Sequence, residues 1–123
     1  MATSAAGTAE RRRRYWRGHI SEWTAAAYLM AKGYRILAWR QRTGAGEIDL
    51  IAARRGRLAF IEVKARWTVE DAEAAITRRQ RRRVRRAANL WLSRNPRRQR
   101  HEIGFDLIFL VRGRWPIHIE NGL

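Results

Sequence analysis

Two carboxylates and a lysine stand close together in an otherwise apolar stretch of the chain. Asp49 is followed, after twelve intervening residues, by Glu62, Val63 and Lys64. Charged groups are costly to bury without partners, so their place among Ile, Leu, Val and Phe residues needs a chemical reason. Paired carboxylates suit Mg²⁺, which completes its coordination with water and phosphate oxygens. A neighbouring lysine can orient water or offset charge on a phosphorane, so this set predicts phosphodiester hydrolysis.

A structural salt bridge is the alternative interpretation of the same residues. In that interpretation Glu62 pairs with Lys64 or Asp49 and the group only stabilises the fold. Lys64 is nevertheless conspicuous, because Lys32 is the one other lysine in a chain with 27 basic residues. Arginine and lysine differ in geometry and in how readily they lose a proton, so a lysine kept at this position favours a chemical role.

A β-hairpin would bring these charges to one place. Two apolar runs, Ile48–Ala53 and Leu58–Val63, flank the basic segment Arg54–Arg57, which contains one glycine and predicts a turn. Side chains alternate between the faces of a strand. Glu62 and Lys64 therefore share one face of the second strand, and Asp49 shares a face of the first with Glu47, which is an auxiliary candidate.

Around this hairpin the pattern predicts a mixed α/β sheet with helices packed on it, in the order α-β-β-β-α-β-β. A strand is expected over Tyr34–Arg42, a connecting loop over Trp67–Ala75, and a final hairpin over Ile103–Val111 and Trp115–Ile119. Pro116 should place the last strand at an edge of the sheet.

The first predicted helix runs from Trp16 or Gly18 to Lys32. Its apolar residues recur at helical spacing and Gly33 follows as a stop. The helix carries one acidic residue, Glu22. Interaction with the positive end of the helix explains Glu22 without invoking a function. The apolar positions taken as its buried face are Ile20, Trp23, Ala26, Ala27 and Met30.

A second predicted helix begins at Thr77 and ends near Ser93. Thr77 with Gln80 suits a capping box, and Val84, Ala87, Ala88, Trp91 and Leu92 form an apolar stripe. Its other faces are dense in arginine, which predicts contact with nucleic acid. A solvated charged face is the alternative. The arginines assigned to nucleic-acid contact are Arg78, Arg79, Arg82, Arg83 and Arg86, and Arg94, Arg97, Arg98 and Arg100 extend the run.

Composition limits the partners and the chemistry. The 123 residues suit one domain, and a formal net charge of +16 predicts a polyanionic partner, although base composition of the genome can also enrich arginine. Without cysteine there is no disulfide and no thiolate metal site. Residues 1–15 are small, polar and basic and are expected to form a disordered tail before a single domain over 16–123. The absence of a long apolar run predicts a cytoplasmic protein with no membrane partner.

Specific stretches of the sequence carry a resemblance. Asp49 and the Glu62-Val63-Lys64 triplet resemble the PD-(D/E)XK nuclease signature. The chain is similar to the YraN-like family over nearly all of its length from Gly18 onward. The similarity is carried by the surrounding GEIDLIA and FIEVKAR, by Ala75, Ile76 and Thr77 at the entry to the arginine-rich helix, and by the Phe105-Asp106 pair. The sequence departs from the family pattern at Arg79, where lysine is expected, and at Gly104, where arginine often stands.

The resemblance implies a restriction-endonuclease-like fold related to Holliday-junction resolvases. It implies that Asp49 and Glu62 bind Mg²⁺, with Mn²⁺ able to substitute, and that Lys64 serves the catalytic water. It further implies that Glu22 approaches the site from the first helix. Gln80 could turn toward the site in resolvase-like relatives, which competes with its capping role.

Together these features predict a Mg²⁺-dependent DNA endonuclease, structure-selective for branched DNA such as Holliday junctions. Because a resolvase makes two paired cuts, a symmetric homodimer is expected. The alternative is a basic nucleic-acid-binding module that retains the fold with weak or no hydrolytic activity. A ribosome-associated RNA-binding protein also fits the charge, but it leaves the acidic residues of the hairpin unexplained.

Overall fold

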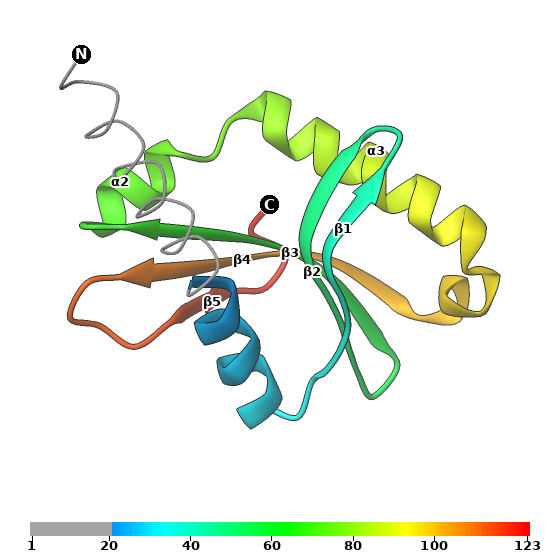
Figure 1. Cartoon of the computed structure of the whole chain (residues 1–123), viewed down its shortest axis with the longest axis horizontal. Coiled ribbons are helices and arrows are strands. Elements are labelled where there is room, and N and C mark those ends of the chain that lie inside the picture. The colour runs from blue at the N-terminus through cyan, green and yellow to red at the C-terminus, as the bar shows by residue number, and fades with distance from the viewer. Residues whose placement is uncertain (1–20) are drawn as a thin grey trace, which may run out of the picture.

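The computed structural model describes residues 21–123, which form one five-stranded sheet with helices on both faces (Figure 1). The expected tail and the expected start of the first helix lie outside the described residues. Helix α3 begins and ends close to the predicted limits, and the predicted strand order is confirmed. The elements are the N-terminal helix (21–31 in the described part), β1 (Arg35–Thr43), β2 (Gly46–Arg54), β3 (Arg57–Arg66), α2 (Val69–Ala74), α3 (Arg78–Arg94), the 3₁₀ helix η1 (Pro96–Arg100), β4 (Glu102–Val111) and β5 (Ile117–Ile119).

The sheet is mixed and its strands follow chain order, β1-β2-β3-β4-β5. Neighbouring strands are antiparallel except β3 and β4, which run parallel from the pair Arg57 and Glu102 to the pair Arg66 and Val111. A parallel pair needs a crossover connection, which α2 and α3 supply. Because β3 and β4 point the same way, their carboxyl ends lie at one edge of the sheet.

The turn between β2 and β3 has the geometry of a tight hairpin. Arg55 and Gly56 both adopt positive φ, at 46° and 79°. Positive φ at both central residues matches a type I′ turn, whose twist suits the flanking strands. The predicted hairpin is therefore confirmed. β5 lies at the sheet edge, as Pro116 predicted.

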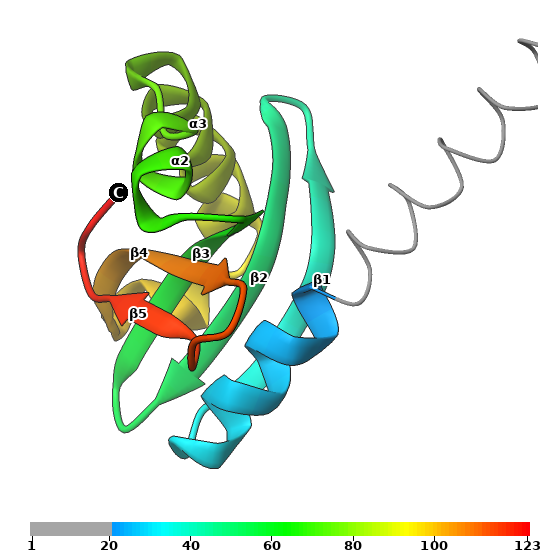
Figure 2. The same ribbon diagram turned by 90° about the vertical axis from the view of Figure 1, so that its left-hand side faces the viewer.

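Helices cover opposite faces of the sheet, as Figure 2 shows. Val84, Ala87 and Ala88 of α3 are fully buried against one face, in a cluster that includes Phe60 and Phe109. The N-terminal helix packs on the other face through a separate apolar cluster. These two layers hold β2 and β3 between them.

The buried face of the N-terminal helix differs from the prediction. Ala25, Ala26 and Leu29 are fully buried, whereas Trp23 is 64% exposed and Met30 is 50% exposed. Small side chains bring the helix close to the sheet. Trp23 instead packs on its neighbour Trp39 of β1, with ring centroids 4.9 Å apart, so its large apolar surface is covered only in part.

The segment predicted as a loop over Trp67–Ala75 contains the short helix α2. Thr68 caps it, because its hydroxyl accepts a hydrogen bond from the backbone N–H of Asp71 at 3.1 Å. Glu70 and Asp71 lie in the first turn, where the helix end is positive. Ala72 anchors the helix in the core. The acidic residues that suggested a solvent-exposed loop therefore stabilise a helix start.

Candidate active site

Strands β2 and β3 separate at the point where the candidate acidic residues lie. Their pairing runs from Arg54 opposite Arg57 to Leu50 opposite Ile61, and the two strands are no longer paired beyond that point. In place of a further strand contact, Asp49 Oδ2 accepts a hydrogen bond from the backbone N–H of Val63 at 2.8 Å. The side chain of Asp49 thus lies in the fork between the two strands and satisfies a partly buried donor there.

Glu62 and Lys64 reach the same fork from β3. Glu62 is 5% exposed, and its Oε1 lies 3.2 Å from Lys64 Nζ. The salt bridge considered as an alternative is therefore present. It does not include Asp49, whose carboxylate contacts a backbone amide instead. The pair leaves one carboxylate of the fork without a cationic partner among the described residues.

Gln80 connects α3 to the site. In the amide orientation that satisfies its hydrogen bonds, the side-chain oxygen lies 2.9 Å from Lys64 Nζ and the nitrogen 2.6 Å from the carbonyl oxygen of Ala75. The opposite orientation gives only a long contact of 3.4 Å to the backbone N–H of Thr77. We adopt the first orientation because it pairs each atom with a suitable partner. Thr77 still caps the helix, accepting from the backbone N–H of Gln80 at 3.1 Å.

The electrostatic setting of Asp49 is unfavourable to its charged form. Burial, together with repulsion from Glu62 and Glu22, raises the pKa of Asp49 to about 7, although the Val63 N–H and Lys64 act in the opposite direction. Opposed environmental effects of this kind are typical of functional carboxylates. The carboxylates of the fork are therefore crowded in a way that a cation would relieve.

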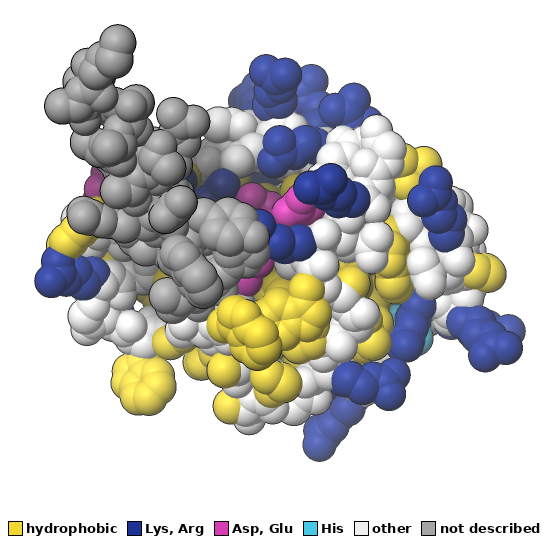
Figure 3. Space-filling model, in the orientation of Figure 1, with side chains coloured by type: hydrophobic (Ala, Val, Ile, Leu, Met, Phe, Trp, Pro, Cys, Tyr) yellow, Lys and Arg dark blue, Asp and Glu magenta, His cyan; other side chains and the backbone are white. Residues whose placement is uncertain are grey.

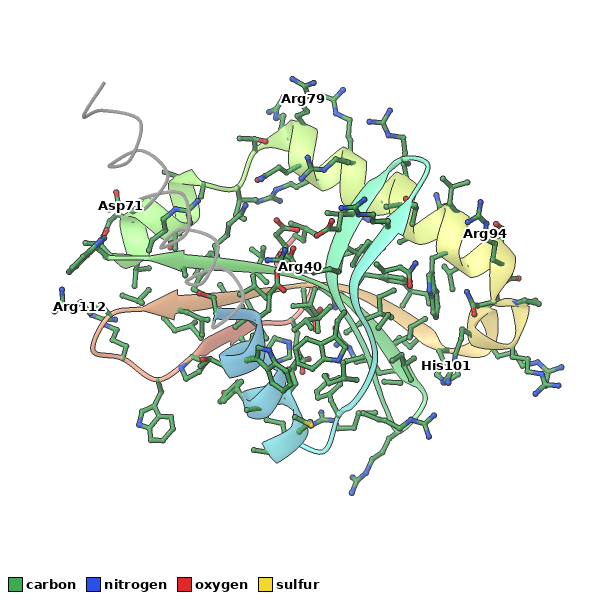
Figure 4. All side chains as sticks on the ribbon, in the orientation of Figure 1. Arg40, Asp71, Arg79, Arg94, His101 and Arg112 are labelled. Carbon is green, nitrogen blue, oxygen red and sulfur yellow. The ribbon has the colours of Figure 1, made fainter. Side chains whose placement is uncertain are left out.

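Glu22 reaches the site from the N-terminal helix, as the family resemblance implied. It is 8% exposed, and its Oε2 accepts a hydrogen bond from Arg40 Nε at 2.6 Å. Arg40 lies at the centre of the view in Figure 4. Glu22 lines the same cavity as Asp49, Glu62 and Lys64. An interaction with the helix end alone therefore does not account for its position.

The cavity has a volume of about 750 Å³ and an arginine-rich wall. Figure 3 shows acidic side chains in a hollow between α3 and the N-terminal helix, with Lys and Arg side chains around them. The wall comes from the adjacent carboxyl ends of β3 and β4 and includes Arg66, Arg112 and Arg114. Trp67 also lines the cavity and is 66% exposed. The guanidinium carbon of Arg112 lies 4.3 Å from the centroid of the Trp67 ring.

Arg112 and Arg114 were not predicted as site residues, whereas Arg66 was noted only as the last residue of the FIEVKAR stretch. Their signal was the basic turn that follows β4, but it could be placed only once β3 and β4 were known to run parallel. Alternation of apolar residues does not reveal strand direction.

Two sets of predicted residues lie apart from the fork. Glu47 is at the β1–β2 turn, where its Oε2 is 3.8 Å from Arg42 Nε, and it does not line the cavity. The assigned arginines of α3 are exposed, and Arg79 projects away from the sheet in Figure 4. Arg83 packs beside Gly46, whose φ of 142° and lack of a side chain permit the contact. The fork thus brings together Glu22, Asp49, Glu62, Lys64 and Gln80.

The acidic residues fit a Mg²⁺ ion in donor type. No three His, Asp or Glu side chains among residues 21–123 are arranged as a ready-made metal cage. Mg²⁺ does not require one, because it commonly binds one or two protein carboxylates and keeps water and substrate phosphate oxygens. The hard oxygen donors of Asp49 and Glu62, and the repulsion between these residues, match that requirement.

A different buried carboxylate, Asp106 of β4, belongs to a structural network. It is fully buried and accepts two hydrogen bonds of 2.7 Å from Arg57, one of 2.9 Å from the Asn121 N–H, and contacts His118 Nε2 at 2.8 Å. Burial raises the pKa of Asp106, but the hydrogen bonds from Arg57 and His118 outweigh it and hold that pKa well below its usual range. A side chain at Gly104 would collide with the Arg57 guanidinium. Glycine at this position therefore gives Arg57 its path to Asp106.

The chain is similar to known proteins over most of its length. The sequence model of an uncharacterised protein family, UPF0102, matches residues 21–110. A UPF0102 protein of Mesorhizobium japonicum is 50% identical over 114 residues, which cover 93% of this chain and 91% of that protein. Another UPF0102 protein, from Maricaulis maris, is 51% identical over 113 residues, which cover 90% of this chain and 87% of that protein.

Within residues 21–123, no helix is long and apolar enough to span a bilayer.

Proposed function

The chain belongs to the uncharacterised protein family UPF0102, the YraN-like family that its sequence resembles, and we propose that it is a Mg²⁺-dependent DNA endonuclease. Mn²⁺ substitutes for Mg²⁺ in this proposal. The observation that carries it is the meeting of Asp49, Glu62 and Lys64 in the fork between β2 and β3. Two acidic side chains and an ammonium group, beside an arginine-lined cavity, suit the hydrolysis of a phosphodiester.

Asp49 and Glu62 would hold the cation. When bound, the ion supplies charge neutralisation on the phosphate and lowers the pKa of a coordinated water. The raised pKa of Asp49 supports this assignment, because it reflects acidic groups crowded without enough positive charge. Glu22 adds to that crowding from the N-terminal helix and assists at the edge of the site.

Lys64 would position the attacking water. Its ammonium group has three N–H donors, of which Glu62 and Gln80 engage two. The third can bind a water or a phosphate oxygen. The water oxygen attacks phosphorus and releases a proton to solvent, the P–O ester bond on the opposite side breaks, and the departing oxygen is protonated from solvent.

The walls of the cavity support a nucleic-acid substrate with an unpaired nucleotide. Arg66, Arg112 and Arg114 supply positive charge for phosphates, and exposed arginines continue along α3. Trp67 offers an exposed ring beside them, and aromatic rings stack on unpaired bases. This arrangement favours branched DNA whose branch point exposes unpaired nucleotides, such as a flap or a Holliday junction opened at its crossover, over continuous duplex. Two coordinated cuts would require a symmetric dimer, and sedimentation on and off DNA tests that requirement.

A non-catalytic nucleic-acid-binding module is the second candidate. It is favoured by the salt bridge that already pairs Glu62 with Lys64. In that case the acidic fork would only stabilise the hairpin.

A cleavage assay separates the two. Purified protein is incubated with four-way junction, flap, duplex and single-stranded DNA, with Mg²⁺, with Mn²⁺ or with chelator, beside the variants Asp49→Asn and Lys64→Ala. The nuclease proposal expects metal-dependent cleavage of branched DNA that both variants lose. Binding without cleavage under every metal condition would support the second candidate, and equal cleavage by all three proteins would show that the assigned site is wrong.

A further inference from the structure

A second basic cavity lies at the opposite end of β3 from the acidic fork. Its volume is about 760 Å³, and it is lined by the segment after the N-terminal helix, the start of β1, the β2–β3 turn with its flanking residues, and η1 with His101 after it. Six of its lining residues are Lys or Arg and one is His, whereas none is Asp or Glu. Those basic residues are Lys32, Arg35, Arg54, Arg55, Arg57, Arg98 and His101. We call this the distal basic cavity.

Some of these basic groups already have partners within the protein. Arg57 is bound to Asp106, Arg54 donates to the backbone oxygen of Lys32 at 2.9 Å, and Lys32 Nζ is 2.7 Å from His118 Nδ1. These contacts hold the inner wall of the cavity in place, so Arg57, Arg54 and Lys32 have a structural role there.

Other groups of the cavity have no such explanation. Arg35, Arg55 and Arg98 make no hydrogen bond or ion pair with a described acidic residue, although Arg98 is half-buried. His101 Nδ1 is buried and has no hydrogen-bond partner within the described chain. A cavity lined by this many basic side chains and by no acidic one selects an anion.

We propose that the distal basic cavity binds backbone phosphates of a nucleic-acid duplex, at a distance from the catalytic fork. Arg55 and Arg98 would contact the phosphate oxygens, and His101 would face them from the inner wall. Figure 4 places His101 beside η1, far along the sheet from Arg112 at the fork end. The polymer, rather than a small anion, is favoured because the arginine-walled cavity of the fork and the distal basic cavity lie at the two ends of one strand.

The separation of the cavities sets the length of duplex needed. Arg57 and Lys64 are seven residues apart on β3, which corresponds to about 23 Å at roughly 3.3 Å per residue. At about 3.4 Å per base step, a duplex arm must extend at least ~7 base pairs from the fork to reach the distal basic cavity. This inference rests on the proposed function for the identity of the polymer, but it requires only binding and no cleavage.

Arm length therefore provides the test. Binding of junctions with arms of 4 or 14 base pairs is measured in chelator for wild type, Arg55→Gln/Arg98→Gln and the control Arg97→Gln/Arg100→Gln. The control removes two exposed arginines of η1 that do not line the cavity. We expect the cavity variant to weaken long-arm binding at least about tenfold beyond the control and to leave short-arm binding like the control. Its salt slope on long arms should fall by about two units, near 0.9 per lost contact.

The outcomes distinguish this inference from the proposed nuclease. Equal losses in both double variants, or equal losses on both arm lengths, would overturn the distal contact while leaving cleavage intact. Arm-dependent binding by a protein that never cleaves would refute the nuclease and retain the distal contact. Titration with pyrophosphate is the remaining experiment. If pyrophosphate binds tightly and only the cavity variant loses this binding, while its duplex affinity is unchanged, the cavity binds a small anion and the proposal is contradicted.

Discussion

Asp49 connects the chemistry of the fork with the stability of the fold. Its side chain satisfies the Val63 N–H, yet burial and neighbouring carboxylates oppose its ionisation. A site built to receive a cation is expected to be strained without one, since the protein stores like charges close together. Asp49 is therefore a place where stability and activity make opposite demands.

The raised pKa of Asp49 gives a prediction for stability. The pKa rises from 3.8 to about 7 on folding, so the folded chain holds a proton that the unfolded chain releases between those pH values. The free energy of unfolding should fall as pH rises through this window. In metal-free buffer, Asp49→Asn should remove that loss and stabilise the protein at pH 8 by on the order of 2 kcal/mol, with little effect at pH 4.

Chemical denaturation at several pH values measures this difference. Glu47→Gln is the matched control, because Glu47 also carries a carboxylate on β2 but pairs loosely with Arg42 outside the cavity. If Asp49→Asn destabilised the protein at pH 8, or shifted its stability equally at every pH, the electrostatic description of the fork would be wrong.

The parallel β3–β4 pair assembles the site and the structure that supports it. One end of the pair carries the cavity walls, and the other carries the ion pair between Arg57 and the buried Asp106. Removing one partner of a buried ion pair leaves an uncompensated charge. The two strands are therefore coupled through this interaction.

Replacing Arg57 should expose that coupling. We expect Arg57→Met to lower the free energy of unfolding by about 3 kcal/mol near pH 7. Because the pKa of Asp106 is depressed, its contribution is present above pH 3.8 and is lost as pH falls further, so the difference should narrow in acid. Denaturant titration measures it, with Arg55→Met, an exposed turn residue, as control. A loss below about 0.5 kcal/mol would indicate that Arg57 does not compensate Asp106.

The carboxyl ends of β3 and β4 also present Trp67 for base stacking. Trp67→Ala should weaken binding of DNA with unpaired nucleotides about tenfold, while plain duplex changes less than about twofold, because a stacked base contributes roughly 1–3 kcal/mol. Trp115→Ala is the control, since Trp115 is 86% exposed but does not line the cavity. Fluorescence anisotropy compares the variants, and equal effects of the two substitutions would exclude a specific role for Trp67.

The sequence predicted elements better than it predicted their faces and directions. The α3 stripe was correct because Val84, Ala87 and Ala88 recur at helical spacing in a segment whose other positions are mostly arginine. On the N-terminal helix Ala26 is buried as predicted, but Trp23, Ala27 and Met30 were wrongly assigned to the buried face. Trp23 is apolar but pairs with Trp39 at the surface. The fork carboxylates could be identified from spacing and resemblance, whereas Arg112 and Arg114 depended on the parallel pairing of two distant strands. Such pairing is a tertiary property that local patterns do not encode.

For the whole molecule, positive charge is the dominant property. A net charge of +16 repels itself unless an anion is bound, and the arginines of α3 are exposed on the side that faces away from the core. Arg82 and Arg86 lie on the helix opposite Val84, so they can be changed without disturbing packing. They test whether α3 belongs to the binding surface.

We expect Arg82→Gln/Arg86→Gln to weaken DNA binding and to lower the slope of log affinity against log salt by roughly two units, one for each lost phosphate contact. Affinity measured at several salt concentrations in chelator gives the slope, and circular dichroism verifies the fold. An unchanged slope would exclude these two residues from the interface.

Single-turnover cleavage of a four-way junction measures whether the fork carries out the chemistry that we propose. Wild type, Asp49→Asn and Glu47→Gln are compared at saturating protein with Mg²⁺. Metal catalysis contributes several kcal/mol, so Asp49→Asn should slow cleavage by at least about 100-fold, while Glu47→Gln stays within about threefold of wild type. Cleavage by Asp49→Asn at the wild-type rate would contradict the account.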